Sequence, residues 1–147
     1  MKAEGPVINF HFKKPCTLRD RQRLKEFIRG IFKSYSRKVD SLDIIFCSDK
    51  YLLGINREYL EHDYFTDIVT FDLAERRSPA IGEMYISVDR VKDNAKDEAA
   101  SFAAELHRVV FHGVLHLCRL RDKTEADQQR MRKAEDRLLR KYFGEEN

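Results

Sequence analysis

The stretch His112-Gly-Val-Leu-His-Leu-Cys-Arg-Leu-Arg-Asp122 decides how the rest of the chain is arranged. Its first half ends an apolar run that repeats at helical spacing, which predicts a helix over Phe102–Leu117. Residues four apart lie on the same side of a helix, so His112 and His116 can turn ring nitrogens toward one point. A metal ion requires this convergence, and the pattern therefore predicts a metal site.

Asp122 is the candidate third ligand. In a straight helix it would lie about 9 Å along the axis from His116, so the helix must end soon after His116 if the three side chains are to meet. The apolar period is lost after Leu117, and Thr124-x-x-Asp127 is typical of the start of another helix. A loop carrying Asp122 would leave a fourth zinc position open to water.

Two histidines four apart also occur by coincidence on helices without a metal. Here they flank the face of the helix that we expect to be buried, which consists of Phe102, Leu106, Val109, Val110, Gly113 and Leu117. We therefore expect both rings to lie half-buried at its edge. A half-buried polar group needs a partner, and a metal ion would supply one to both rings.

Length and composition indicate a charged globular protein of one domain, residues 1–147, because 147 residues suit a single core. No apolar run approaches the roughly 20 residues of a membrane span, and a secretory leader pattern is absent. The three cysteines are scattered and odd in number, which favours a reducing compartment. We predict a cytoplasmic protein without a membrane partner; the oligomeric state stays open.

The net charge of +3 does not by itself indicate nucleic acid. Its distribution says more, because Arg119, Arg121 and Lys123 surround Asp122. A positive field beside a metal favours a phosphate-rich substrate. The basic residues that follow, after Asp127, suit the solvated face of a helix, where part of their charge is offset by Glu125, Asp127, Glu135 and Asp136.

Periodicity predicts four strands, over Val7–Phe12, Leu42–Cys47, Ile68–Phe71 and Gly82–Val88. It predicts five helices: one after a capping box at Thr17-x-x-Asp20, one capped by Ser48 or Asp49, one capped by Asp89, the histidine helix, and one from about Thr124 to Phe143 before Gly144. Strands interleaved with helices indicate an α+β domain: a four-stranded mixed sheet packed with five helices, with a zincin-like metal-site helix.

Three segments resemble one family. The opening stretch is similar to His-Gly-x-Leu-His-Leu-x-Gly-Tyr-Asp-His, Asp63-Tyr-Phe-Thr-Asp-Ile-Val-Thr-Phe71 to Asp-x-x-Thr-Asp-Val-Leu-Ser-Phe, and Gly82-Glu-Met-Tyr-Ile-Ser87 to Gly-Asp-Ile-x-Ile-Ser. Glu105 also stands where the family often has an acid. In this order and spacing, the segments resemble the YbeY family of bacterial rRNA-maturation factors.

The resemblance implies a zinc-dependent, single-strand-specific endoribonuclease acting in 16S rRNA 3′-end maturation and ribosome quality control. It implies rRNA and the small ribosomal subunit as partners, and one zinc ion per chain on His112, His116 and Asp122, which would also be the catalytic residues. The attacking group would be metal-activated water or the ribose 2′-hydroxyl. Four residues are weaker candidates for RNA contacts: Arg57, Thr66, Arg119 and Arg121.

Three positions depart from the family pattern. Asp122 replaces the third histidine, and its negative charge should make the metal acidify its water less. Arg119 replaces a glycine, where a positive φ would help to end the helix. Leu60 replaces an arginine near the substrate groove, and Arg57, one turn earlier, is a possible substitute.

Two other functions compete with this one. A metalloprotease of the His-Glu-x-x-His type needs a glutamate beside the first histidine, and position 113 is glycine. The second is an RNA- or ribosome-associated binding factor with a structural or vestigial metal site, and Leu60 and Asp122 keep it open.

Overall fold

The computed structural model describes residues 5–144, which form one four-stranded sheet and five helices. The elements, in chain order, are β1 (Val7–Phe12), α1 (Arg21–Ser34), β2 (Val39–Cys47), α2 (Asp49–Leu60), β3 (Ile68–Asp72), β4 (Ala80–Ser87), α3 (Val88–Asp97), α4 (Phe102–Leu117) and α5 (Glu125–Phe143). The strand order is β1-β2-β4-β3. Strands β1, β2 and β4 are parallel, and β3 runs antiparallel to β4 at the edge. The predicted mixed α+β fold is confirmed.

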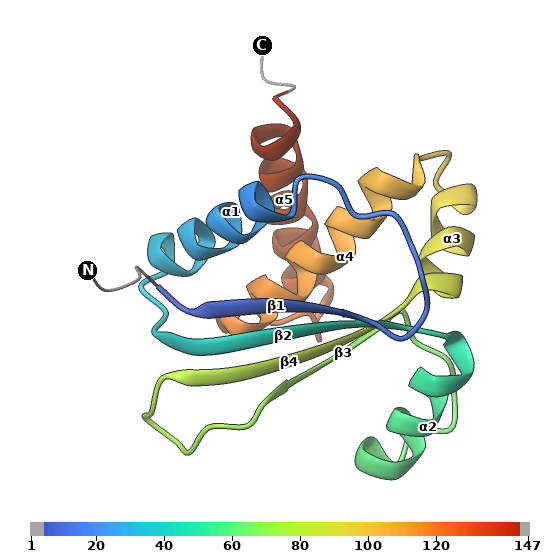
Figure 1. Cartoon of the computed structure of the whole chain (residues 1–147), viewed down its shortest axis with the longest axis horizontal. Coiled ribbons are helices and arrows are strands. Elements are labelled where there is room, and N and C mark those ends of the chain that lie inside the picture. The colour runs from blue at the N-terminus through green and yellow to red at the C-terminus, as the bar shows by residue number, and fades with distance from the viewer. Residues whose placement is uncertain (1–4, 145–147) are drawn as a thin grey trace.

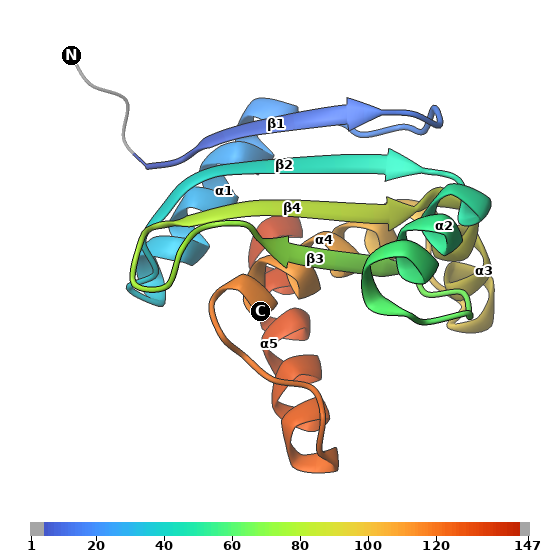
Figure 2. The same cartoon turned by 90° about the horizontal axis from the view of Figure 1, so that it is seen from below.

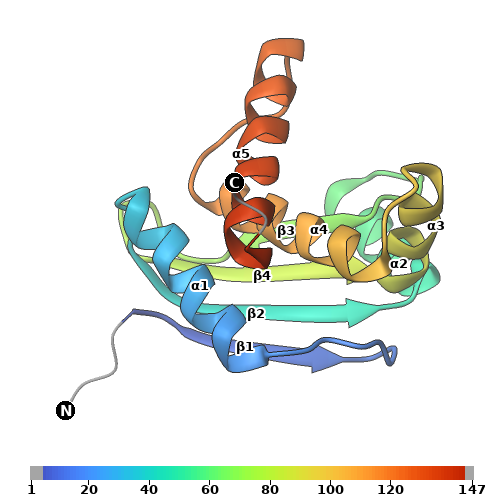
Figure 3. The ribbon, with the colours of Figure 1, turned by 90° about the horizontal axis from the view of Figure 1, so that it is seen from above.

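Helices α1, α4 and α5 cover one face of the sheet (Figures 1 and 3). Side chains alternate along a strand, and Leu42, Ile44 and Phe46 of β2 all point into the main core under these helices. The opposite face is largely open, with α2 at one end (Figure 2). The site helix α4 therefore rests on a rigid apolar platform.

Most predicted elements are present, with small shifts at their ends. Strand β2 begins at Val39, earlier than predicted, and Val88 begins α3 instead of ending β4. The capping box Thr124–Asp127 and the left-handed Gly144 bound α5 as expected. At the start of α2, Ser48 is the cap, and its Oγ accepts a hydrogen bond from Tyr51 N.

Two predicted caps are wrong. Ser87 caps α3 instead of Asp89: its Oγ accepts from Arg90 N at 3.0 Å, and the Asp89 carboxylate accepts from Asp49 N. Helix α1 lacks a capping box, because Asp20 takes a left-handed φ of 53° and its side chain makes no cap hydrogen bond. At α3, the partner of Asp89 comes from a distant part of the chain, which a local sequence pattern does not show.

No helix among residues 5–144 has both the length and the apolar character needed to cross a bilayer.

Candidate metal centre

Helix α4 begins at Phe102, where Ser101 Oγ accepts a hydrogen bond from Ala104 N at 3.0 Å. The predicted apolar face is buried, except that Phe102 is only partly covered. The helix ends at Leu117, and Arg119 then takes a left-handed φ of 75° while its N–H donates to His116 O. The chain therefore turns back directly after His116, as a third ligand on the following loop requires.

This turn brings Asp122 to His112. The distance from His112 Nε2 to Asp122 Oδ2 is 3.3 Å, and Gln128 Nε2 holds the loop by donating to Asp122 O at 3.1 Å. Two ligand atoms, each about 2.0–2.1 Å from a tetrahedral zinc ion, lie about 3.3 Å apart. The pair therefore fits as two ligands when the imidazole is neutral, and it is an ion pair when the imidazole is protonated.

His116 lies one turn further along α4 and is exposed, whereas the prediction placed it half-buried. Partial burial lowers the pKa of its imidazole, with the charge of Asp122 acting in the opposite direction and that of His112 in the same one. Within residues 5–144, no group of three or more His, Cys, Asp or Glu side chains is already gathered to hold a metal ion. Two of the three predicted ligands thus lie together, and the full ligand set stays a prediction.

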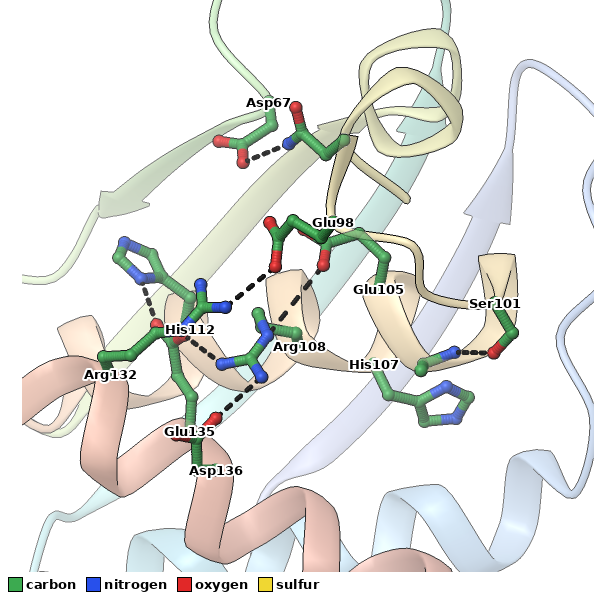
Figure 4. Close-up of polar contacts among 12 residues, drawn as sticks. Asp67, Glu98, Ser101, Glu105, His107, Arg108, His112, Arg132, Glu135 and Asp136 are labelled. Atoms are coloured by element: carbon green, nitrogen blue, oxygen red, sulfur yellow. Dashed lines mark hydrogen bonds and ion pairs between the residues drawn. The ribbon is translucent and has the colours of Figure 1, made fainter. Parts of the chain in front are cut away.

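The second nitrogen of His112 has a protein partner that the sequence did not suggest. His112 Nδ1 lies 2.7 Å from Glu135 Oε2 on α5, and Arg108 Nη1 lies 3.0 Å from Glu135 Oε1 (Figure 4). Burial by itself would lower the pKa of His112, but the hydrogen bond and charge of Glu135, aided by Asp122, raise it above its ordinary value.

The sequence suggested that Glu135 balances charge on a solvated face of the last helix, and this is wrong. Its side chain is only 6% exposed. It lies on the buried stripe of α5, beside Met131 and Leu138. The signal was present: Glu135 interrupts an apolar series at helical spacing, where a buried acid needs a partner.

His112 and Asp122 line a pocket of about 280 Å³ that we call the acidic pocket. Its charged lining residues are Asp67, Glu98, Glu105, Arg108, Asp122, Arg132 and Glu135. Burial, aided by the charge of Glu98 and opposed by that of Arg108, raises the pKa of Glu105 to about 7. Burial likewise raises the pKa of Asp67, whose carboxylate accepts from Asn94.

His116 lines a different hollow, of about 360 Å³, that we call the basic groove. Its charged lining residues other than His116 are Arg37, Asp72, Glu75, Arg76, Arg77 and Arg119. Arg37 is tied to Asp72 Oδ2 at 2.9 Å. Among residues 5–144, no ion pair involves Arg76, Arg77 or Arg119. The groove therefore offers guanidinium groups to an anion.

The four candidate RNA contacts have different surroundings. Arg119 lines the basic groove, whereas Arg121 is exposed and lines neither hollow. Arg57 is paired with Asp63, and it also lines neither hollow. Thr66 Oγ1 accepts from Asn56 Nδ2 at 2.9 Å, which ties the segment before β3 to α2. Geometry thus favours Arg119 among the four.

Position 113 has no space for the glutamate of a metalloprotease. A Cβ added at Gly113 would lie 2.6 Å from Met84 Cε and 2.8 Å from Ile68 Cδ1. This side of α4 packs directly on β4 and β3, so a glutamate at position 113 would point into the core and not toward the pocket.

Comparison with known proteins identifies the family. A family model described as Endoribonuclease YbeY matches residues 9–143. The chain belongs to the YbeY family. A YbeY relative, the Endoribonuclease YbeY of Cytophaga hutchinsonii, is 44% identical over 88% of this chain and 92% of that protein. The Endoribonuclease YbeY of Porphyromonas gingivalis is 40% identical over 95% of this chain and 94% of that protein.

The fold agrees with a solved structure. The solution structure of TM1509 from Thermotoga maritima matches with a TM-score of 0.64 and 25% identity, and the match covers 95% of this chain and 91% of that one. The YbeY resemblance inferred from the three sequence segments is therefore confirmed. The structure places two of the residues that depart from the YbeY sequence pattern. Arg119 takes the positive φ expected of a glycine, and Leu60 is the last residue of α2.

Proposed function

We propose that the chain is a zinc-dependent, single-strand-specific endoribonuclease that holds one zinc ion with His112, His116 and Asp122. Membership of a family whose relatives are named Endoribonuclease YbeY supports the reaction class. The observation that carries the site is the 3.3 Å approach of His112 Nε2 to Asp122 Oδ2. His116, one turn further along α4, lines a hollow that also contains Arg76, Arg77 and Arg119.

A bound zinc ion would lower the pKa of its water and polarise a phosphate oxygen. The chain's own residues supply the rest of the chemistry. Arg76, Arg77 and Arg119 bind phosphodiester oxygens through charge-assisted hydrogen bonds and hold the strand against His116. The attacking oxygen comes from water or from the ribose 2′-hydroxyl, and both forms need the strand in the same groove.

The proposed substrate is rRNA of the small ribosomal subunit, with roles in 16S rRNA 3′-end maturation and ribosome quality control. Support comes from the family resemblance, and the groove adds a physical reason for a nucleic-acid strand. Phosphates dominate the affinity of proteins for nucleic acid, and here cations gather on the His116 side while acids gather on the His112 side. A polyanion would thus approach from the groove.

Cleavage of a single-stranded RNA by zinc-loaded protein tests the proposal. His116→Ala should lower the cleavage rate more than about 100-fold, because loss of even an outer-shell partner of a metal costs 10–100-fold. His62→Ala is the matched control, since His62 is also exposed but stacks on Tyr64 away from both hollows. Cleavage by His116→Ala at the wild-type rate, with the fold intact, would refute the proposal.

One observation favours a second candidate, an RNA- or ribosome-binding factor. The three proposed ligands are not gathered as a set within residues 5–144, as would suit a vestigial metal site. The same assay separates the two functions. RNA binding that is indifferent to a chelator, without cleavage by zinc-loaded protein, would favour the binding factor.

A further inference from the structure

Glu135 is almost fully buried, and both of its carboxylate oxygens have a protein partner. Oε2 accepts from His112 Nδ1 at 2.7 Å, and Oε1 accepts from Arg108 Nη1 at 3.0 Å. A buried carboxylate is costly unless it is paired and hydrogen-bonded. These two contacts offset that cost and leave the acid in one orientation.

Arg108 is itself held in place. Its Nη2 donates to Asp136 Oδ1 at 2.7 Å, and its side chain is only 16% exposed. Arg108 lies on the same helix as His112, whereas Glu135 and Asp136 lie on α5 (Figure 4). A chain of charge-assisted contacts thus runs from Asp136 through Arg108 and Glu135 to the imidazole, and it joins the two helices at that point.

This chain fixes the proton on His112. A carboxylate paired with a guanidinium can only accept a hydrogen bond, so Nδ1 must carry the proton. A neutral ring then presents its lone pair at Nε2, the atom that lies 3.3 Å from Asp122. His116 has no comparable anchor: no hydrogen bond to its side chain is found among residues 5–144.

We propose that Glu135 is a positioning residue that holds His112 with Nε2 free for the metal, and that Arg108 holds Glu135. The inference rests on the proposed function, since it assigns a role toward the proposed zinc ion. Histidine ligands commonly donate their other N–H to a carboxylate, which fixes the ring and raises its basicity. Here the acid comes from a different helix, so the packing of α5 on α4 sets the geometry of the site.

Glu135→Gln tests this with little change of shape. Zinc affinity, measured by competition with a chelator of known affinity, should fall 10–100-fold. Glu125→Gln is the matched control, because Glu125 lies on the same helix but is exposed and lines neither hollow. We expect the control to bind zinc as tightly as the wild type does. Wild-type affinity in Glu135→Gln would overturn the proposal.

A measurement on metal-free protein keeps the test independent of the proposed activity and of the variant's folding. The nitrogen NMR shifts of wild-type His112, at a pH high enough to leave the ring neutral, report which nitrogen carries the proton. We expect the proton on Nδ1 in the wild type and a mixture in Glu135→Gln. A neutral wild-type ring protonated on Nε2 would overturn the proposal. Absence of zinc binding in the wild type would refute the proposed function, while the NMR result would still decide whether Glu135 fixes the ring.

Discussion

The acidic pocket and the basic groove take their histidines from successive turns of α4, and the two histidines have different surroundings. In the pocket, His112 is anchored by Glu135 on α5. In the groove, His116 is exposed beside arginines that have no ion pair within residues 5–144. One side is therefore built to hold the protein's own side chains, and the other leaves its charges available to a ligand.

The charges of the two hollows also differ in their effect on the stability of the folded protein. Burial raises the pKa of two acids of the pocket, Glu105 and Asp67, so their negative charge destabilises the folded state. The guanidinium groups of the groove stay near water, where an unpaired charge costs little. A phosphate strand is repelled by the first region and attracted by the second. Stability should thus respond to changes in the pocket, and RNA binding to changes in the groove.

Removing one acid from the pocket should stabilise the protein at high pH. Glu105 is 3% exposed, and its pKa in the folded protein is about 7, against 4.5 ordinarily. We expect Glu105→Gln to raise the free energy of unfolding by about 2–3 kcal/mol at about pH 8 and to change it little at about pH 5. Denaturant unfolding at the two pH values measures this.

The sign follows from proton binding. Between about pH 4.5 and about pH 7, folded Glu105 keeps a proton that the unfolded chain has lost, so stability falls as pH rises through this window. Glu125→Gln, an exposed control, should change stability by about 0.5 kcal/mol or less at either pH. An equal effect of Glu105→Gln at both pH values would contradict a charge cost in the pocket.

Reversing one charge in the groove should weaken RNA binding without loss of stability. We expect Arg76→Glu to weaken binding of a single-stranded RNA about tenfold at low salt, and to reduce the slope of log affinity against log salt by about 1. Arg130→Glu changes the net charge equally, but Arg130 lines neither hollow. If both variants lose the same affinity, overall charge and not the groove governs binding.

Arg119 affects both stability and RNA binding, and we expect its replacement to give the smallest change in stability. Its left-handed φ of 75° costs a non-glycine residue roughly 1 kcal/mol. Arg119→Gly should raise the free energy of unfolding by about 1 kcal/mol or less while weakening RNA binding. Arg121→Gly is the control, since Arg121 is not among the positive-φ residues of the described chain and should gain no stability. If Arg119→Gly gained both stability and RNA affinity, Arg119 would not be one of the residues through which the groove binds RNA.

The features that the sequence predicts well are those set by local periodicity. The apolar repeat of Phe102–Leu117 predicted α4, its buried face and its end after His116, because burial against a sheet selects that spacing. The need for Asp122 to fold back to His112 predicted a turn, and the turn is present. Periodicity also predicted the four strands and five helices of the mixed α+β fold, which the structure confirms.

The features it missed depend on contacts between distant segments. Glu135 meets His112 only because α5 packs on α4, and the local pattern of α5 can indicate a buried acid but not its partner. The groove combines Arg37 from the turn before β2 with Arg76 and Arg77 from the loop before β4. The end of α4 then adds His116 and Arg119 to it. The basic residues around Asp122 predicted a positive region there. Three of the four arginines that line the groove, however, come from other parts of the chain.

Zinc content and affinity of the purified protein, wild type against Asp122→Ala, test the central claim most directly. Asp122 lies 3.3 Å from His112 Nε2 and is the only proposed ligand outside α4. The account predicts about one zinc ion per wild-type chain and a loss of most of the zinc in Asp122→Ala, because an open site of three ligands tolerates few deletions. Equal zinc content and affinity in the two proteins would remove Asp122 from the site and contradict the account.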